Sequence, residues 1–333
     1  MTQLCEPGQP TCDGSRATVC DETGLGYLPQ GTDCQPQGER CQRGACVDTP
    51  NQCPNTVAMA GAAAAQVPLR ADFIVAPASA DITLDGSAST DDSRVARVRW
   101  TLVGSPRGVQ IRETGNPLVA TASGLSPYEE YLFQAVAIDN EQEESCQPET
   151  VRVHTVGAET LVFHLLWDNE LDPDPFDERG SDVDIHLLKA RRGTWFDRET
   201  DCHWGAPAPE WEPERPRQIL DDTNGRGPEI IVLDNPEPCN WYALAVHYFE
   251  TEGFGSALAH LHIFRQGRLV LATTDHPLAD RGAWWEPAII HWESGRTFAI
   301  DRTFPAPRNG SRPVFSEEAL ASELCGIPGD LDD

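Results

Sequence analysis

Long apolar runs are absent from this chain of 333 residues. Apolar runs such as 62–65 and 161–167, the second interrupted by His164, are far shorter than the ~20 residues that a helix needs to cross a bilayer. We therefore expect no transmembrane segment. Basic residues are scarce as well, because 25 Lys and Arg face 53 Asp and Glu, which gives a formal net charge of −28. Since this charge repels nucleic acid and anionic lipid, nucleic-acid binding is not expected, and the composition favours a cation as partner.

Catalytic signatures are missing too. The chain contains no GxSxG motif, no phosphate-binding loop, no GxGxxG after an expected strand and no HExxH pair. We therefore expect a protein that is not an enzyme. The first residues lack the basic start and apolar stretch of a signal peptide. Leu4-Cys5 has the form of a lipoprotein junction, but without the residues that precede one, so we expect the export signal to lie outside this chain.

Cysteine is abundant at the N-terminus. Seven of the eleven cysteines fall in the first 53 residues, among Gly, Pro, Gln and Asp with few aliphatic residues, so this segment cannot fold around an apolar core. It contains no histidine and no CxxC pair, which makes a zinc site the weaker alternative to disulfides. Disulfides predict an extracellular or cell-surface location. The pairing of the first six cysteines stays open. The seven are Cys5, Cys12, Cys20, Cys34, Cys41, Cys46 and Cys53.

Composition and turn signals predict an all-β chain in four parts: a disulfide-rich module at 1–50, an immunoglobulin-like sandwich at 51–157, a larger jelly-roll-like sandwich at 158–304 and a tail at 305–333. In the second part Trp100 alternates with arginines along an expected strand at 95–103 and is expected to point inward. Cys53 and Cys146 flank this part, and we expect them to form a disulfide. The other strands expected there are 71–76, 82–84, 131–138 and 151–156.

The second part carries a family resemblance. Its run Leu84-Asp85-Gly86-Ser87-Ala88-Ser89-Thr90-Asp91-Asp92, with Trp100 and the later Val136-Ala137-Ile138-Asp139-Asn140, resembles PKD-type immunoglobulin-like domains of secreted bacterial proteins. The resemblance implies a spacer or adhesion module without catalysis.

The third part contains eight runs typical of strands, and eight of the nine tryptophans lie from Trp167 onward. These runs predict a two-sheet sandwich with a tryptophan-rich core. The tail predicts one helix at 316–324, with Ser316 as its N-cap. The expected strands are 160–167, 183–188, 229–233, 241–249, 257–264, 269–273, 288–292 and 297–300.

Two acidic stretches of the third part predict a calcium site. Asp182, Asp184 and His186 alternate with apolar residues, so they share one face of a strand at steps of about 6–7 Å. The glycine-rich stretch 221–229 adds further oxygen ligands, and Ca²⁺ takes 6–8 oxygens in irregular geometry. The alternative is a solvated turn. The expected ligands are Asp182, Asp184, Asp221, Asp222, Asn224 and Glu229.

Histidines leave two chemical alternatives open. A transition metal would be held by histidines of the expected strands together with Asp184. A metal-dependent hydrolase would use the face that carries Asp182, Asp184 and His186. Carboxylates of the loop 169–180 could serve glycan hydrolysis or lend a ligand to the ion. The histidines concerned are His186, His247, His260 and His262.

The same segments resemble the YfaP-like domain, whose function is unknown. The resemblance rests on the motifs at 181–186, 201–204, 221–229 and 246–249, and it covers residues 53–293. In secreted proteins of myxobacteria and their relatives such domains follow a PKD-like module and a cysteine-rich region, which implies the same architecture here. The acidic motifs also resemble, more distantly, calcium-binding jelly-roll modules of secreted peptidases.

The remaining cysteines and tryptophans give two further predictions. Cys202 and Cys239 both adjoin expected strands and are expected to pair, which leaves Cys325 free or bonded to another chain. The loop residues Trp204 and Trp211, with Trp284 or Trp285, could stack on sugar rings. Of Trp284 and Trp285, we expect Trp285 to be the residue that stacks on a sugar.

We therefore expect a secreted or surface-displayed, non-enzymatic binding or display protein with a calcium-stabilised C-terminal sandwich. Its expected partners are an extracellular glycan or protein ligand in adhesion or carbohydrate binding, and envelope proteins. The hydrolase and a structural spacer of an envelope assembly are the alternatives.

Overall fold

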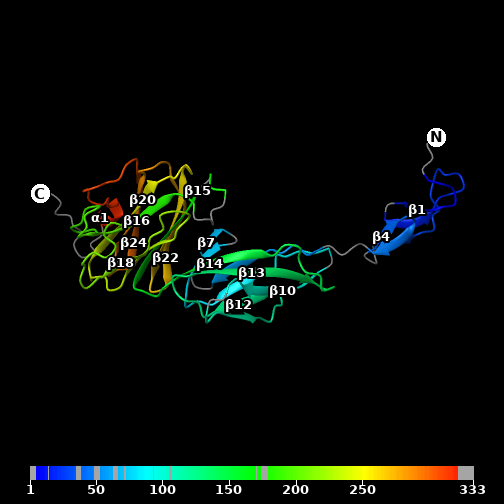
Figure 1. The fold of residues 1–333 in the computed structure, drawn as a ribbon, viewed down its shortest axis with the longest axis horizontal. Coiled ribbons are helices and arrows are strands. Elements are labelled where there is room, and N and C mark those ends of the chain that lie inside the picture. Colours follow the sequence, from blue (N-terminus) through cyan, green and yellow to red (C-terminus); the bar gives the residue numbers. More distant parts are fainter. Residues whose placement is uncertain are drawn as a thin grey trace. The chain divides into compact units, whose positions relative to one another are not determined.

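The computed structural model describes residues 5–13, 15–34, 39–48, 53–62, 67–70, 73–92, 94–104, 107–169, 171–173 and 179–321. These residues form strands and a single short helix, α1 (Glu317–Ala321), which confirms the all-β prediction (Figure 1). Ser316 Oγ accepts a hydrogen bond from Ala319 N at 3.2 Å, as expected of an N-cap. No helix in the described part of the chain is long and apolar enough to span a membrane. Cys325 lies outside these residues.

The chain divides into two units, the first made of residues 1–55, 90–96 and 137–146 and the second of the rest. The first unit has little apolar core and is held by disulfides, as its composition predicts. Its strands form the sheet β1-β2-β3 and the hairpin β4-β5. The strands are β1 (Pro10–Asp13), β2 (Arg16–Val19), β3 (Thr32–Asp33), β4 (Glu39–Gln42) and β5 (Ala45–Asp48), and the disulfides are Cys5–Cys20, Cys12–Cys41 and Cys34–Cys46.

The predicted disulfide between Cys53 and Cys146 is present in the first unit. Close to it, Asp139 is fully buried, and its Oδ1 accepts hydrogen bonds from the backbone N–H groups of Glu141 and Glu143, both at 2.8 Å. A short-range aspartate turn therefore fixes the loop that precedes Cys146.

The PKD-type part of the second unit is a sandwich of the sheets β10-β13-β14-β8-β7 and β11-β12-β9-β6. All neighbours are antiparallel except β14 and β8, which are parallel. Trp100 is buried, as the alternation along its strand predicts. The strands are β6 (Met59–Ala62), β7 (Val67–Arg70), β8 (Phe73–Pro77), β9 (Ile82–Asp85), β10 (Val95–Leu102), β11 (Gln110–Glu113), β12 (Val119–Ser123), β13 (Glu130–Asp139) and β14 (Glu149–Val156).

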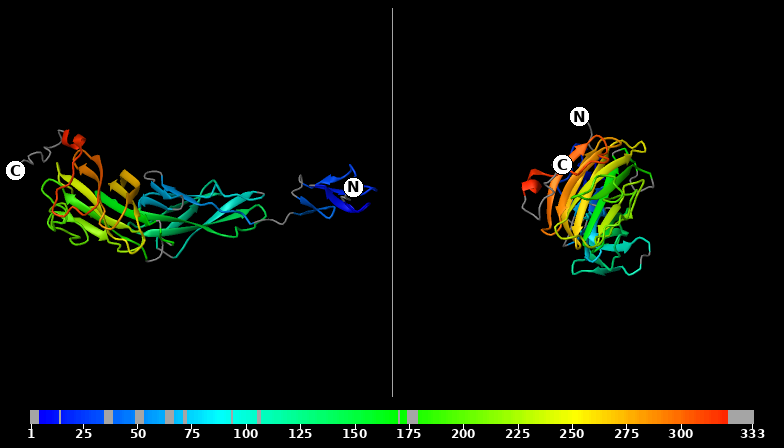
Figure 2. Two further views of the ribbon diagram at one scale, coloured as in Figure 1. Left: turned by 90° about the horizontal axis from the view of Figure 1, so that it is seen from above. Right: turned by 90° about the vertical axis from the view of Figure 1, so that its left-hand side faces the viewer.

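The larger sandwich stacks the sheet β18-β19-β15-β21-β22 on the sheet β17-β16-β20-β23-β24 (Figure 2). All eight expected strands are present, and the short β17 and β18 join them. Between the sheets lies a core that includes Trp167, Tyr248 and Trp285. The strands are β15 (Leu161–Asn169), β16 (Asp182–Lys189), β17 (Asp201–Cys202), β18 (Pro216–Leu220), β19 (Glu229–Leu233), β20 (Trp241–Glu250), β21 (Ala257–Arg265), β22 (Arg268–Leu278), β23 (Trp284–His291) and β24 (Arg296–Phe304).

A second apolar cluster covers the outer face of the sheet that contains β16. Trp195, from the loop after β16, packs edge-to-face on Trp284 with ring centroids 5.2 Å apart. Phe315, from the segment after β24, packs on Trp241 at 5.9 Å. Strand β16 is therefore buried on both faces, whereas the alternation of its residues predicted one polar face. The face is covered because segments without strand periodicity fold back over it.

The predicted Cys202–Cys239 disulfide is wrong. Cys202 is a free, fully buried thiol, and Cys239 is disulfide-bonded elsewhere. Cys202 lies directly opposite Leu187 in the pairing of β17 with β16, so both side chains point into the core between the sheets. Its Sγ lies 3.5 Å from the carbonyl oxygen of Pro207.

We expect the thiol of Cys202 to be inert in the native protein. Burial raises its pKa, and a thiol without thiolate character or access to solvent does not react with a disulfide reagent. The measurement is labelling with 5,5′-dithiobis(2-nitrobenzoate) in buffer and in guanidinium chloride, with the labelled peptide identified by mass spectrometry. Labelling of the Cys202 peptide at the same rate in both conditions would contradict the buried placement.

Candidate functional site

The two acidic stretches meet at the edge where β16 lies next to β19. Three carboxylates come together here, each with one oxygen within 4.8 Å of an oxygen of the other two. They belong to Asp184 of β16, to Asp221 of the loop between β18 and β19, and to Glu229, the first residue of β19. Glu229 is fully buried, and its Oε2 accepts a hydrogen bond from Ile185 N at 2.5 Å, across the gap between the two sheets. Gln218 Nε2 donates to its Oε1 at 3.3 Å. The fold therefore holds three carboxylates in close contact at one end of β16.

This concentration of negative charge disturbs the protonation of the carboxylates. Burial, the charge of Asp184 and a hydrogen bond with Asp221 raise the pKa of Glu229 well above its ordinary value. Burial raises the pKa of Asp182 to about 7, and the charges of Asp184, Asp221 and other nearby acids add to the effect. Such a group of carboxylates is stable at neutral pH when it shares protons or binds a cation, and its all-oxygen donor set suits Ca²⁺.

A pocket of about 210 Å³ opens onto this group. Two of its lining residues are exposed aromatic side chains, Trp204 at 47% and Phe249 at 39%, with ring centroids 5.8 Å apart. Asp182 also lines it, although its residue is only 9% exposed, and among the described residues its Oδ1 has no hydrogen-bond partner. The pocket therefore combines acidic groups with an apolar rim. The full lining is Asp182, Asp184, Trp204, Asp221, Thr223 and Phe249.

Two of the expected ligands take other roles. Both oxygens of Asp222 accept backbone hydrogen bonds, Oδ1 from Asn224 N at 3.2 Å and Oδ2 from Gly227 N at 3.0 Å. Asp222 therefore shapes the loop, in agreement with the turn alternative. Asn224 is exposed and lines a different pocket of about 250 Å³ with Arg179. Asp222 and Asn224 do not belong to the close carboxylate group, and neither does Asp182.

The histidines form a buried cluster next to the carboxylates. His186 Nδ1 lies 2.8 Å from Asp201 Oδ2, and its ring stacks on His203 with centroids 4.8 Å apart. Burial lowers the pKa of His186 to about 3 and that of His203 to about 4. His247 Nδ1 lies 3.3 Å from Asp184 Oδ2 and thus orients that carboxylate from the neighbouring strand β20.

The burial of His186 weakens the hydrolase alternative. His186 is fully buried, and its ring centroid lies 4.7 Å from that of Phe196 and 4.9 Å from that of Trp284. A general base must come within hydrogen-bonding distance of the proton that it removes. The histidine of the expected catalytic face is therefore covered by protein. His260 is bound through Nε2 to Asp168 Oδ2 at 3.2 Å.

Of the three tryptophans predicted to stack on sugar rings, one is exposed. Trp211 is buried, stacks on Tyr242 with centroids 6.5 Å apart and donates to the carbonyl oxygen of Glu199 at 2.8 Å. Trp285 is buried as well, and its Nε1 donates to Asp301 Oδ1 at 3.0 Å. Their ring faces serve the core, so the predictions for Trp211 and Trp285 are wrong, and only Trp204 presents its ring to solvent.

The sequence prediction missed the aromatic partner of Trp204. Phe249 and His247 alternate with the core residues Val246 and Tyr248 along β20, so they share its outer face. The alternation itself is visible in the sequence. It places Phe249 near the acidic strand β16 only when β16 and β20 are known to be neighbours, which the structure shows.

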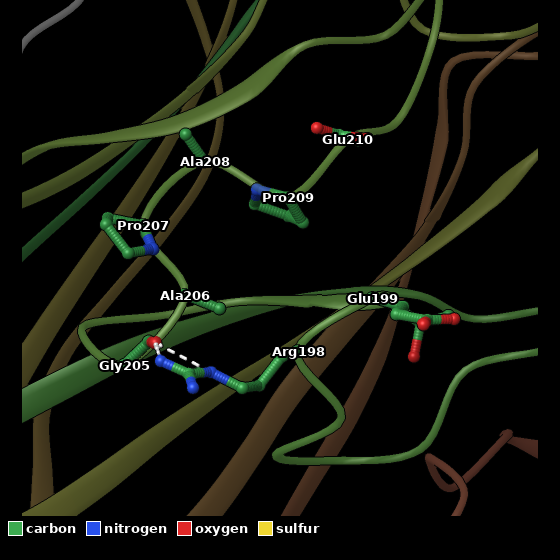
Figure 3. Close-up of a pocket in the computed structure, with 9 residues that line it drawn as sticks. Arg198, Glu199, Gly205, Ala206, Pro207, Ala208, Pro209 and Glu210 are labelled. Atoms are coloured by element: carbon green, nitrogen blue, oxygen red, sulfur yellow. Dashed lines mark hydrogen bonds between the residues drawn. The ribbon is translucent and has the colours of Figure 1, made fainter.

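Another pocket, of about 740 Å³, lies between the chain before β17 and the loop after it (Figure 3). Arg198 crosses it, with Nε and Nη2 donating to the carbonyl oxygen of Gly205 at 3.2 and 2.7 Å. Its guanidinium is thus engaged in holding the loop, and Glu199 and Glu210 are exposed. No group of polar side chains converges in the pocket, so we do not assign chemistry to it. The lining residues are Arg198, Glu199, Thr200, Gly205, Ala206, Pro207, Ala208, Pro209 and Glu210.

One protein family matches part of the chain. A family model for a PKD domain matches residues 70–165. The chain therefore contains a PKD-type domain, which confirms the resemblance inferred from the Asp85-Gly86-Ser87 motif. No curated protein matches the chain.

Several solved structures are similar to parts of the chain. The solution structure of the PKD domain from KIAA 1837 protein is 28% identical, and the match covers 30% of this chain and 86% of that domain with a TM-score of 0.21. Chitinase ChiA74 from Bacillus thuringiensis is 12% identical over 68% of this chain and 30% of the chitinase, with a TM-score of 0.26. The titin domains z1z2 in complex with telethonin are 11% identical over 60% of this chain and 90% of theirs, with a TM-score of 0.19. At these TM-scores the structures carry no argument about function.

Proposed function

We propose that this chain is a non-enzymatic extracellular or cell-surface binding protein whose C-terminal sandwich is stabilised by Ca²⁺. The observation that carries the proposal is the close approach of the carboxylates of Asp184, Asp221 and Glu229 beside a pocket with exposed aromatic rings. The PKD-type domain, a non-catalytic module, and four disulfides among the described residues support the class and the location. Adhesion and envelope partners belong to the same proposal.

The calcium would be held by the three carboxylates of the close group. Each carboxylate can supply one or two oxygens, and the open pocket leaves room for water to complete a coordination number of 6–8. The ion would neutralise charges that otherwise repel one another, and it would link β16 of one sheet to β19 of the other. Its role in this proposal is structural.

The glycan-binding prediction has less support than it had from the sequence alone, because two of its three tryptophans are buried. The expected platform of three tryptophans contains one exposed ring, Trp204, which shares its pocket with Phe249. A single stacking ring can support one sugar unit. The hydrolase alternative has less support, because His186, the histidine of its expected catalytic face, is fully buried. The resemblance to the YfaP-like domain stays a prediction.

We expect chelation to lower the melting temperature of the purified protein by several degrees, and added Ca²⁺ to restore it. Binding to the folded state alone stabilises it by about 2.7 kcal/mol when the free ion is at 100 times its Kd. The measurement is thermal unfolding followed by circular dichroism, in EDTA and in excess CaCl₂.

Two variants make this test specific. Asp221→Asn removes one charge from an exposed member of the carboxylate group and should abolish the response to calcium. Asp81→Asn makes the same change at an exposed aspartate of the PKD-type domain and should leave the response intact. If the carboxylates share protons and bind no ion, the chelator will leave the melting temperature of each of the three proteins unchanged.

A further inference from the structure

More acidic side chains lie in and beside this pocket than one divalent ion can balance when all of them are ionised. Besides the three carboxylates of the close group, Asp182 and Asp222 lie near enough for their charges to interact. Another neighbour, Glu250, is compensated by Arg281 at 3.0 Å. With Ca²⁺ on Asp184, Asp221 and Glu229, as proposed above, the pocket would remain anionic.

Asp182 is the group on which a further cation could bind. It lines the pocket and is 91% buried, and its Oδ1 has no hydrogen-bond partner in the described part of the chain. A buried carboxylate oxygen without a donor is costly, so the site favours a ligand that brings one. A donor that is also positively charged gives the stronger hydrogen bond.

The rim of the pocket suits the same kind of ligand. The rings of Trp204 and Phe249 lie nearly edge-to-face, at an interplanar angle of 61°, and both are exposed. Trp204 is steadied by an edge-to-face contact with the buried ring of His203 at 6.0 Å. Aromatic rings beside carboxylates attract ammonium groups, and their faces also pack against an alkyl chain.

Size and charge narrow the choice of ligand. About 210 Å³ is less than the roughly 300–1,000 Å³ of pockets for drug-sized ligands, so the pocket accommodates one side chain or a small amine. A neutral sugar could stack on Trp204, but it would leave the charge of Asp182 unbalanced. An alkylammonium group satisfies the carboxylate and the aromatic rim together.

We propose that this pocket binds an alkylammonium group on an apolar stem, with the ammonium at Asp182 and the stem packed against the exposed rings of Trp204 and Phe249. The chemistry is shared by the lysine side chain of a protein partner and by a free amine. The proposal rests on the proposed function only in that it places calcium on the neighbouring carboxylates.

The test uses the full chain in excess CaCl₂ and isothermal titration calorimetry. We expect Nα-acetyl-lysine methylamide to bind with a millimolar Kd and its uncharged counterpart, Nα-acetyl-norleucine methylamide, to bind at least tenfold more weakly. Putrescine serves as the free-amine arm. Tighter binding of putrescine would identify a small amine as the source of the ammonium group, and tighter binding of the lysine derivative would identify a polypeptide.

Variants link the binding to the pocket. Trp204→Ala should weaken binding of the lysine derivative at least fivefold, whereas Trp204→Phe should retain most of it, because cation–π attraction needs only a ring. Asp182→Asn should weaken it at least tenfold. Val270→Ala, which shortens an exposed apolar residue of β22, is the matched control and should have no effect.

The outcomes separate this inference from the calcium proposal. Trp204→Ala should keep the full calcium-dependent rise in melting temperature. If calcium stabilises the protein but neither amine binds, the ammonium site is wrong and the calcium proposal stands. Equal binding of the lysine and norleucine derivatives, or binding of methyl glycosides in place of amines, would also overturn the ammonium site.

Discussion

Replacing Glu286 by alanine is expected to lower the free energy of unfolding by about 3–5 kcal/mol. Glu286 lies on β23, is 2% exposed and accepts four hydrogen bonds. Its Oε1 accepts from Trp195 Nε1 at 3.0 Å, Trp284 Nε1 at 3.2 Å and Arg308 Nη1 at 2.6 Å, and its Oε2 accepts from Val314 N at 2.7 Å. Removing the carboxylate leaves a guanidinium and three N–H groups without this acceptor in the second apolar cluster.

The loss should be visible in structure as well as in stability. Because Glu286 connects β23 to the segment 305–316, Glu286→Ala should expose that segment to trypsin at Arg308 and Arg312. The measurements are urea unfolding by tryptophan fluorescence and limited proteolysis. Glu286→Gln keeps an acceptor and should lose less stability, and Glu210→Ala, at an exposed glutamate, should change stability by no more than about 0.5 kcal/mol. A loss below about 1 kcal/mol in Glu286→Ala would show that the carboxylate does not anchor the segment.

The second large effect is a loss of stability in acid that arises from His164 and His262. These residues lie opposite each other on β15 and β21, with ring centroids 5.7 Å apart. Both are fully buried, and no ring nitrogen of either has a hydrogen-bond partner among the described residues. Burial lowers the pKa of His164 well below its ordinary value and that of His262 to about 3. Both rings are therefore neutral in the folded protein.

The sign of the effect follows from proton binding. An unfolded histidine takes up a proton near pH 6.5, whereas folded His262 does so only near pH 3, so the unfolded state binds more protons between these values. Stability is independent of this group above pH 6.5 and falls as the pH decreases below it. For His262 alone, the loss reaches roughly 3 kcal/mol at pH 4.

Urea unfolding as a function of pH tests the assignment. His262→Leu should keep the neutral-pH stability within about 1.5 kcal/mol, because the ring makes no hydrogen bond, and should reduce the slope between pH 6.5 and pH 4. The double variant with His164→Leu should flatten the curve further. Identical slopes in the wild-type protein and the double variant would show that these histidines are not the groups that titrate.

Periodicity accounts for what could be predicted of the fold. The eight long runs of the large sandwich are strands because their apolar side chains recur at every second position or fill both faces. Strand β17 has two residues and β18 begins with Pro216, so neither carries such a signal. The burial of the outer face of β16 was not predictable, because Trp195 and the segment 305–316 reach it from irregular chain.

The site was predictable as a meeting of two acidic stretches, but its members were not all identified. Asp221 and Asp222 are adjacent in an irregular loop, where no period tells which side chain points inward. The structure assigns Asp221 to the carboxylate group and Asp222 to backbone turns. Trp211 and Cys202 were misassigned for a related reason, since being near a strand end does not determine whether a side chain enters the core.

Direct measurement of bound calcium tests the central claim most closely. Protein purified without chelator, exchanged into buffer with micromolar CaCl₂ and analysed by native mass spectrometry should contain one Ca²⁺ per chain. Asp221→Asn should contain none, and Asp81→Asn should match the wild-type protein. A wild-type protein that remains free of calcium as CaCl₂ is raised to millimolar concentrations would contradict the claim.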